Sequence, residues 1–196
     1  GKRPDYPARR GRFGCAAKFM PRLYGDHDRQ VVSNAPDAAR IEAIEATYPG
    51  SEIAIEKKLD AGTHFDRYFA SYLSDGFKYF ALLTVPQGEK PESGWPVVVF
   101  NHGYIPPEVY QTTERYVAYV DYLARSGFVV FKIDYRGHGN SEGVPSGGYF
   151  SPGYTIDAIS ALRSLQGLDF IDPNGIGMWG HSMAGNMVLR AMLIEP

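Results

Sequence analysis

A serine within a run of small residues is the part of this sequence with the clearest chemical potential. Gly180-His181-Ser182-Met183-Ala184-Gly185 follows a short apolar segment, residues 176–179, and precedes a segment with helical spacing, residues 187–194. A sharp strand-to-helix turn would lift the Ser182 hydroxyl off a sheet edge, and small neighbours let the adjacent backbone pass. The same turn would aim the first helix amides at a reacting carbonyl. The spacing predicts a nucleophilic serine.

Two further polar motifs each follow an apolar run. Asn101-His102-Gly103-Tyr104 comes directly after residues 97–100, and Asp134-Tyr135-Arg136-Gly137-His138-Gly139-Asn140-Ser141 comes shortly after residues 128–131. Continuous apolar runs of this kind are typical of strands buried on both faces of a parallel sheet. We therefore expect both motifs to lie at the sheet edge that carries the serine turn.

Together these segments resemble α/β-hydrolases, and they are most similar to prolyl-oligopeptidase-like and dienelactone-hydrolase-like esterases and peptidases, over roughly residues 60–196. Residues 101–104 stand where such enzymes place an oxyanion-hole loop, and residues 136–141 match their Arg-Gly-His-Gly-x-Ser turn. Residues 172–177 match their approach to the nucleophile elbow. One departure is Ala184, where glycine is usual. Because alanine is nearly as small and Gly185 follows, we expect an intact elbow.

The resemblance implies a role for three residues. Ser182 would be the nucleophile, and the backbone N–H groups of Tyr104 and Met183 would form the oxyanion hole. The phenol of Tyr104 is a weaker candidate for a third donor. A serine at the elbow favours hydrolysis of carboxylic esters, whereas aspartate would favour dehalogenation and cysteine dienelactone-type hydrolysis. We predict a serine esterase with a small-molecule ester substrate.

Two alternatives to an esterase stay open. A peptidase of the prolyl-oligopeptidase type normally carries a β-propeller before its hydrolase domain, which about 60 leading residues cannot form. A non-catalytic binding module of the same fold would have no need to keep a strained nucleophile turn. Both observations favour the esterase.

None of the five histidines has the chain position that the family gives to its general base. His102 and His138 are expected to hold their own loops, His181 to point away from the attack direction, and His27 and His64 to lie far from the site. Their spacing does not suit a zinc site, so we predict neither a metal nor another cofactor.

The acid and the histidine of such enzymes follow the serine on later strands. Here only the elbow helix and Glu195-Pro196 come after it. We therefore expect a second polypeptide, such as one made by cleavage after Pro196, to supply the remaining strands, the acid and the histidine. Residues 1–196 alone should then be inactive, and either poorly soluble or partly folded.

The elements that position these motifs divide the chain into two parts. Residues 1–59 are predicted to form an irregular arm over residues 1–38, a short helix over residues 38–48 and a first strand. Residues 60–196 read as the amino-terminal part of an α/β-hydrolase domain. It opens with antiparallel strands joined by a hairpin turn at Ser74-Asp75-Gly76.

Strand and helix signals alternate from residue 95 onward. Helices are expected over residues 116–124, 156–165 and 187–194, and a turn at Asp172-Pro173-Asn174-Gly175. The alternation predicts an α/β fold of the α/β-hydrolase type. Its mostly parallel sheet should have an antiparallel opening and helices on both faces.

The composition excludes several classes of protein. The chain of 196 residues has 20 basic and 22 acidic side chains, a balance that does not suggest a nucleic-acid partner. Cys15 is the single cysteine, so no internal disulfide can form. The apolar runs are too short for a transmembrane segment. We expect a soluble protein of undetermined compartment, with an extracytoplasmic location after removal of a leader as one alternative.

Overall fold

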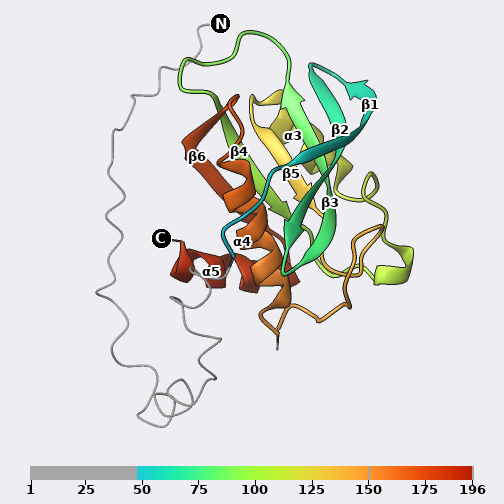
Figure 1. Ribbon diagram of the computed structural model, residues 1–196. Coiled ribbons are helices and arrows are strands. Elements are labelled where there is room, and N and C mark those ends of the chain that lie inside the picture. Colours follow the sequence, from blue (N-terminus) through green and yellow to red (C-terminus); the bar gives the residue numbers. More distant parts are fainter. Residues whose placement is uncertain (1–47, 150, 196) are drawn as a thin grey trace, which may run out of the picture. The chain divides into compact units, whose positions relative to one another are not determined.

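The computed structural model describes residues 48–149 and 151–195, which contain a six-stranded sheet with helices on both of its faces (Figure 1). The predicted arm and the predicted helix over residues 38–48 lie outside the described residues, apart from Tyr48. The strands are β1 (Ala54–Gly62), β2 (Phe65–Ser74), β3 (Phe77–Pro86), β4 (Trp95–Asn101), β5 (Val129–Ile133) and β6 (Ile171–Gly180). The helices are η2 (Pro107–Val109), α3 (Val117–Arg125), α4 (Gly153–Leu165) and α5 (Met183–Ile194).

The sheet opens with antiparallel strands, as predicted. Its order is β1-β2-β3-β5-β4-β6, and each of the first three pairings in this order is antiparallel. The hairpin turn between β2 and β3 has two residues, Asp75 and Gly76, with φ of 53° and 78°. A two-residue turn with two positive φ values matches the right-handed twist of the flanking strands. Glycine adopts a positive φ without steric cost, which accounts for Gly76 at the second position. The predicted boundary between residues 59 and 60 falls inside β1.

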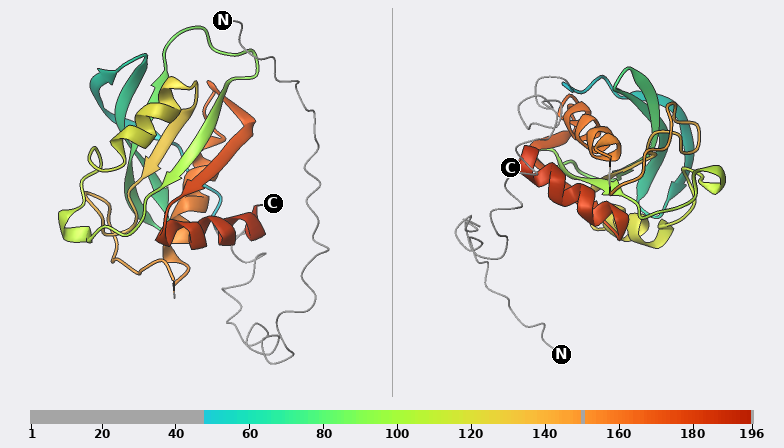
Figure 2. Two further views of the ribbon diagram at one scale, coloured as in Figure 1. Left: turned by 180° about the vertical axis from the view of Figure 1, so that it is seen from behind. Right: turned by 90° about the horizontal axis from the view of Figure 1, so that it is seen from below.

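The second half of the sheet is parallel and holds the core. Strand β4 pairs in parallel with both β5 and β6, and all five residues of β5 are buried. Alternate side chains face opposite sides: Val129 and Phe131 pack with α4 and α5, whereas Val130 packs with α3. The two views in Figure 2 show α3 on one face of the sheet and α4 and α5 on the other. The predicted fold class is confirmed.

Strand β6 differs from the prediction in two ways. The expected turn at residues 172–175 lies inside the strand as a bulge, because pairing with β4 passes from Ile171 directly to Ile176. The N–H of Asn174 donates to Oδ1 of Asp172 at 2.9 Å, which closes the bulge locally. Residues 176–179 are half-buried or exposed rather than buried. Among the described residues β6 pairs only with β4, so one of its edges has no neighbouring strand.

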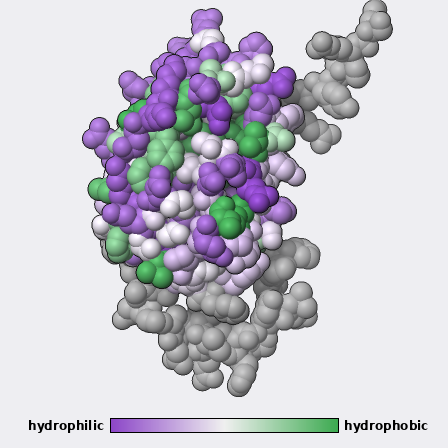
Figure 3. All heavy atoms as spheres, turned by 90° about the vertical axis from the view of Figure 1, so that its right-hand side faces the viewer, coloured by the Kyte–Doolittle hydropathy of each residue, from purple (hydrophilic) through white to green (hydrophobic). Residues whose placement is uncertain are grey.

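On the side that carries the antiparallel strands, the surface formed by residues 48–149 and 151–195 is mixed in polarity. Figure 3 shows hydrophobic residues there as separate patches in a mostly hydrophilic surface. Scattered apolar side chains of this kind are normal at a protein surface. Within the described part of the chain, every helix is too short or too polar to cross a membrane.

Candidate active site

Ser182 occupies the turn between β6 and α5 in a conformation that L-residues rarely adopt. Its φ is 55° and its ψ is −117°, its side chain is exposed, and α5 begins at the next residue. Backbone strain of this kind costs of order 1–3 kcal/mol and is found mainly at functional sites. The strand–turn–helix geometry is thus the one that the sequence predicts, and the buried Ala184 leaves it intact.

The turn is tight because its neighbours are small. A Cβ atom added to Gly180 would lie 2.6 Å from the carbonyl oxygen of Ala184 and 2.7 Å from Cγ2 of Val188. Strand β6 therefore approaches the first turn of α5 closely only because residue 180 is glycine.

The loop after β4 lies beside this turn. The side-chain amide of Asn101 donates to the carbonyl oxygens of Val99 and Trp179, each at 3.1 Å. The N–H of His181 donates to the carbonyl oxygen of Asn101 at 3.4 Å. A Cβ atom on Gly103 would lie 3.1 Å from the carbonyl oxygen of His181. The two motifs that the sequence places at one sheet edge are therefore in contact.

The backbone amides of Tyr104 and Met183, at this junction, have no acceptor within the described residues, and neither has that of Ser182, between β6 and Met183. Two other amides at the junction are occupied. Gly103 N–H donates to the Tyr116 hydroxyl at 3.0 Å, and Ala184 N–H donates to the carbonyl oxygen of His181 at 3.1 Å. The oxyanion hole formed by the N–H groups of Tyr104 and Met183 stays a prediction. The Tyr104 side chain is 69% exposed.

His102 is buried and neutral. Its Nδ1 lies 2.7 Å from the carbonyl oxygen of Gly103, which can only accept, so Nδ1 carries the hydrogen. Its Nε2 is buried and has no hydrogen-bond partner within the described residues. The ring lies between those of Tyr110 and Tyr135 at centroid distances of 4.6 and 4.3 Å. Burial lowers the pKa of His102 to about 3. This side chain holds the loop.

Two of the other described histidines form hydrogen bonds to groups other than the serine. Nδ1 of His138 lies 3.2 Å from the carbonyl oxygen of Arg136, and burial lowers the pKa of His138. Nδ1 of His181 lies 2.9 Å from the Tyr116 hydroxyl. His64 lies in the turn between β1 and β2. In the described ranges, none of these side chains or that of His102 hydrogen-bonds to Ser182.

The motif after β5 has a structural function. Asp134 is buried and accepts hydrogen bonds from the hydroxyls of Tyr110, at 2.6 Å, and Thr112. Burial raises the pKa of Asp134. Lys132, two residues earlier on β5, is also buried, and its pKa is lowered by burial.

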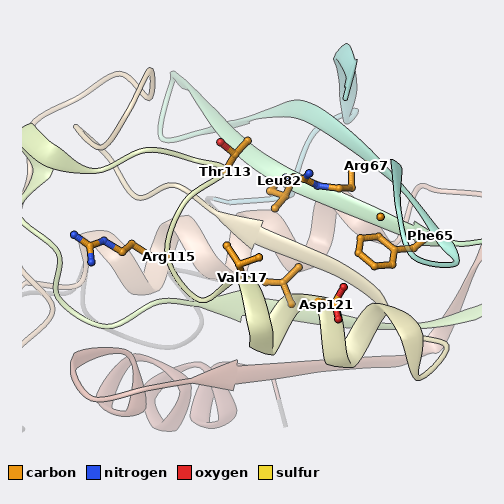
Figure 4. A pocket seen from close by; sticks show the side chains of 9 residues that line it. Phe65, Arg67, Leu82, Thr113, Arg115, Val117 and Asp121 are labelled. Carbon is orange, nitrogen blue, oxygen red and sulfur yellow. The ribbon is translucent and has the colours of Figure 1, made fainter. Parts of the chain in front are cut away.

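A separate cavity of about 110 Å³ lies between β2, β3 and α3 (Figure 4). Its walls include Phe65, Leu82 and Val117, whereas neither Ser182 nor residues 101–104 line it. No group of three acidic, histidine or cysteine side chains suited to a metal ion occurs within residues 48–149 and 151–195.

Comparison with known families identifies the fold. The model of the family described as serine aminopeptidase, S33, matches residues 95–196. The chain belongs to this family of α/β-hydrolases. The match contains the loop after β4, the motif after β5 and the turn at Ser182. The sequence prediction of an α/β-hydrolase is confirmed.

Curated members of related families align with parts of the chain. Human protein ABHD12B is 31% identical over 98 residues, which are 50% of this chain and 25% of that protein. Lysophosphatidylserine lipase ABHD12 of Danio rerio is 28% identical over 156 residues, 70% of this chain and 38% of that protein. Human dipeptidyl peptidase 8 is 30% identical over 136 residues, 64% of this chain and 15% of that protein. The chain thus spans well under half the length of these relatives.

Solved structures show the same fold. The acetyl xylan esterase from Paenibacillus sp. R4 superposes with a TM-score of 0.59 at 22% identity, covering 77% of this chain and 52% of that one. Brefeldin A esterase, a bacterial homologue of human hormone sensitive lipase, superposes with a TM-score of 0.52 at 21% identity. That likeness covers 79% of this chain and 41% of the esterase chain. The S33-family chain therefore has the architecture of α/β-hydrolases up to the helix after the elbow.

Proposed function

We propose that this protein is a serine hydrolase that cleaves carboxylic esters through an acyl-enzyme on Ser182. One observation carries the proposal. Ser182 has a strained backbone at a strand-to-helix turn, an exposed hydroxyl, and two unoccupied backbone amides nearby, those of Tyr104 and Met183. Strain persists only where the surrounding structure enforces it, and the close packing of Gly180 on Ala184 does so here.

In the proposed reaction, Ser182 Oγ attacks the carbonyl carbon of the ester while its proton passes to a general base. The Tyr104 and Met183 amides stabilise the negative charge that develops on the carbonyl oxygen. The C–O bond to the alcohol then breaks, and the protonated base returns the proton to the leaving alcohol. Water hydrolyses the acyl-enzyme by the same steps, which releases the acid and restores the serine. Each oxyanion donor contributes about 10²–10³ in rate in such enzymes.

The general base and its acidic partner are proposed to come from a part of the enzyme outside the described residues. The four described histidines support this, because His102 and His138 are buried against carbonyl groups and His181 is bonded to Tyr116. A segment that completes the site would come to lie near β6, whose outer edge is unpaired within the described chain. This segment could belong to the same polypeptide or to a second one. An intact-mass measurement of the purified enzyme distinguishes the two cases.

A peptidase is the second candidate. The family description and the similarity to dipeptidyl peptidase 8 favour it. The longer alignment, over 156 residues, is with a lysophosphatidylserine lipase, and a lipase cleaves a carboxylic ester. We therefore place ester hydrolysis first.

The test compares two serines of the full-length protein. Hydrolysis of p-nitrophenyl acetate and of an aminoacyl p-nitroanilide is measured for the wild type, for Ser182→Ala and for Ser93→Ala, whose serine lies in an exposed loop. We expect the ester to be the better substrate, Ser182→Ala to lose at least about 10⁴-fold in kcat, and Ser93→Ala to be unchanged. Near-normal ester hydrolysis by Ser182→Ala would overturn the proposal. Preference for the anilide would establish the peptidase, and a wild type inactive on both would indicate a binding module.

A further inference from the structure

The hydroxyl of Tyr116 is the meeting point of three segments of the site. It accepts the Gly103 N–H at 3.0 Å and lies 2.9 Å from Nδ1 of His181. Gly103 belongs to the loop after β4, His181 to the turn that carries Ser182, and Tyr116 immediately precedes α3. Because the amide uses a lone pair of the hydroxyl oxygen, the O–H itself is available to donate to Nδ1 of a neutral imidazole. One side chain thus joins the oxyanion loop to the elbow.

The ring of Tyr116 is held in place by aromatic side chains of the sheet. It packs edge-on against Phe100 of β4 at a centroid distance of 5.6 Å, and against Trp179 of β6 at 6.0 Å. Phe100 and Trp179 stack on each other at 4.1 Å. The two strands that lead into the loop and into the elbow therefore also fix the position of the hydroxyl that joins them.

The backbone that carries Tyr116 is strained. Arg115 and Tyr116 have φ of 56° and 52°, so two consecutive side-chain-bearing residues adopt the left-handed conformation. Such residues are uncommon singly and rarer in pairs. Arg115 and Val117, on either side of Tyr116, both line the cavity shown in Figure 4. The left-handed turn thus redirects the chain between the loop and α3.

The Lys132 side chain hydrogen-bonds to the backbone of this turn. Its Nζ donates to the carbonyl oxygen of Glu114 at 2.7 Å and lies 3.4 Å from that of Arg115. The side chain comes from the fully buried strand β5 and is itself 1% exposed. A buried ammonium that donates to the carbonyls of a strained turn stabilises the strained conformation.

On the basis of the proposed hydrolase activity, we propose that Tyr116 is a positioning residue for the oxyanion hole. Its hydroxyl occupies the Gly103 N–H, which leaves the Tyr104 N–H as the loop amide free for substrate, and it fixes the loop against the elbow. Lys132 positions Tyr116 by holding the turn at Glu114 and Arg115. A Cβ atom on Gly103 would lie 2.7 Å from the Tyr116 hydroxyl, so the contact also requires glycine at position 103.

The first test measures kcat and KM for p-nitrophenyl acetate in the full-length enzyme. Tyr116→Phe keeps the ring packing and removes only the hydroxyl, and Tyr122→Phe is the matched control, since that residue is 71% exposed on α3, the helix that Tyr116 precedes. We expect kcat of Tyr116→Phe to fall about 10–100-fold with KM changed less than about 2-fold, because the loop donor is misplaced in the transition state. Tyr122→Phe should match the wild type.

The second test follows the amides directly. Hydrogen exchange measured by NMR in the wild type should show a protected Gly103 amide and a rapidly exchanging Tyr104 amide. In Tyr116→Phe the Gly103 amide should lose its protection, and in Tyr122→Phe it should keep it. This readout needs neither substrate nor activity, and the wild-type measurement alone decides the contact if Tyr116→Phe does not fold.

The outcomes separate this proposal from the one on which it rests. Wild-type kcat in Tyr116→Phe, with Ser182→Ala inactive, would overturn the positioning role and leave the serine mechanism in place. An unprotected Gly103 amide in the wild type would also overturn it. Activity retained in Ser182→Ala would instead refute the proposed function, whatever the exchange rates at Gly103.

Discussion

Arg136 and Asp157 form a buried ion pair, with Nη2 of the arginine 2.8 Å from Oδ1 of the aspartate. Nε and the backbone N–H of Arg136 donate to the other carboxylate oxygen, at 3.2 and 3.1 Å. Asp157 lies in α4 and is fully buried, whereas Arg136 belongs to the motif after β5. Burial raises the pKa of Asp157, and the hydrogen bonds from Arg136 oppose that effect. The pair joins the loop beyond β5 to helix α4.

Breaking this pair on one side should be strongly destabilising. We expect Asp157→Leu to lower the free energy of unfolding by about 3–5 kcal/mol, because it leaves a partly buried guanidinium without its main partner. The double variant Arg136→Met with Asp157→Leu should lose less than the single variant. Urea unfolding followed by circular dichroism measures both. A single variant within about 1 kcal/mol of the wild type would show that the pair does not hold the loop.

The two glycines that flank the elbow should respond in opposite directions to alanine. Gly180→Ala should destabilise the protein by about 1–3 kcal/mol, since its Cβ would meet the carbonyl oxygen of Ala184 at 2.6 Å. Gly185→Ala, in α5, should stabilise it by about 0.5–1 kcal/mol, because no atom lies within 4 Å of the added methyl group. Thermal denaturation of both variants checks this. Equal effects would contradict the described packing of the turn.

The buried imidazole of His102 should make the protein less stable in acid. Its pKa is about 3 in the folded protein against 6.5 for an unperturbed histidine, so only the unfolded chain takes up a proton between these values. The stability is therefore complete above about pH 6.5 and is lost as the pH falls toward 3, by about 1.4 kcal/mol per pH unit. His102→Asn retains a donor for the carbonyl oxygen of Gly103 and should lack this dependence. Parallel stability–pH profiles for the two proteins would contradict the expectation.

Local signals in the sequence predicted the parts of the fold that depend on local chemistry. Gly76 marked the hairpin because positive φ suits glycine, and the valine-rich run of β5 marked a strand buried on both faces. Ser182 was identifiable because small residues surround it between a strand and a helix. Helix α5 begins at Met183 rather than near Met187, since the elbow leads directly into its first turn.

Features that depend on distant partners were not predictable in the same way. The burial of β6 depends on neighbouring strands rather than on its own apolar residues. The residues from Asp172 onward, which the sequence predicts to form a turn, instead form a bulge within that strand. The contact between Tyr116 and His181 joins residues 65 positions apart. The sequence pattern indicates only that Tyr116 is an apolar position of a predicted helix. Asp157 was not identified from the sequence, although a carboxylate within an apolar helix is a signal that a partner is needed.

The most direct measurement of the central claim is covalent labelling of Ser182. The full-length protein is incubated with an alkyl fluorophosphonate, digested and analysed by tandem mass spectrometry, with heat-denatured protein and Ser182→Ala as controls. We predict one phosphonyl adduct, on the Ser182 side chain, that appears only in the folded wild type and abolishes ester hydrolysis. An enzyme that loses its esterase activity to the reagent while Ser182 remains unmodified would contradict the account.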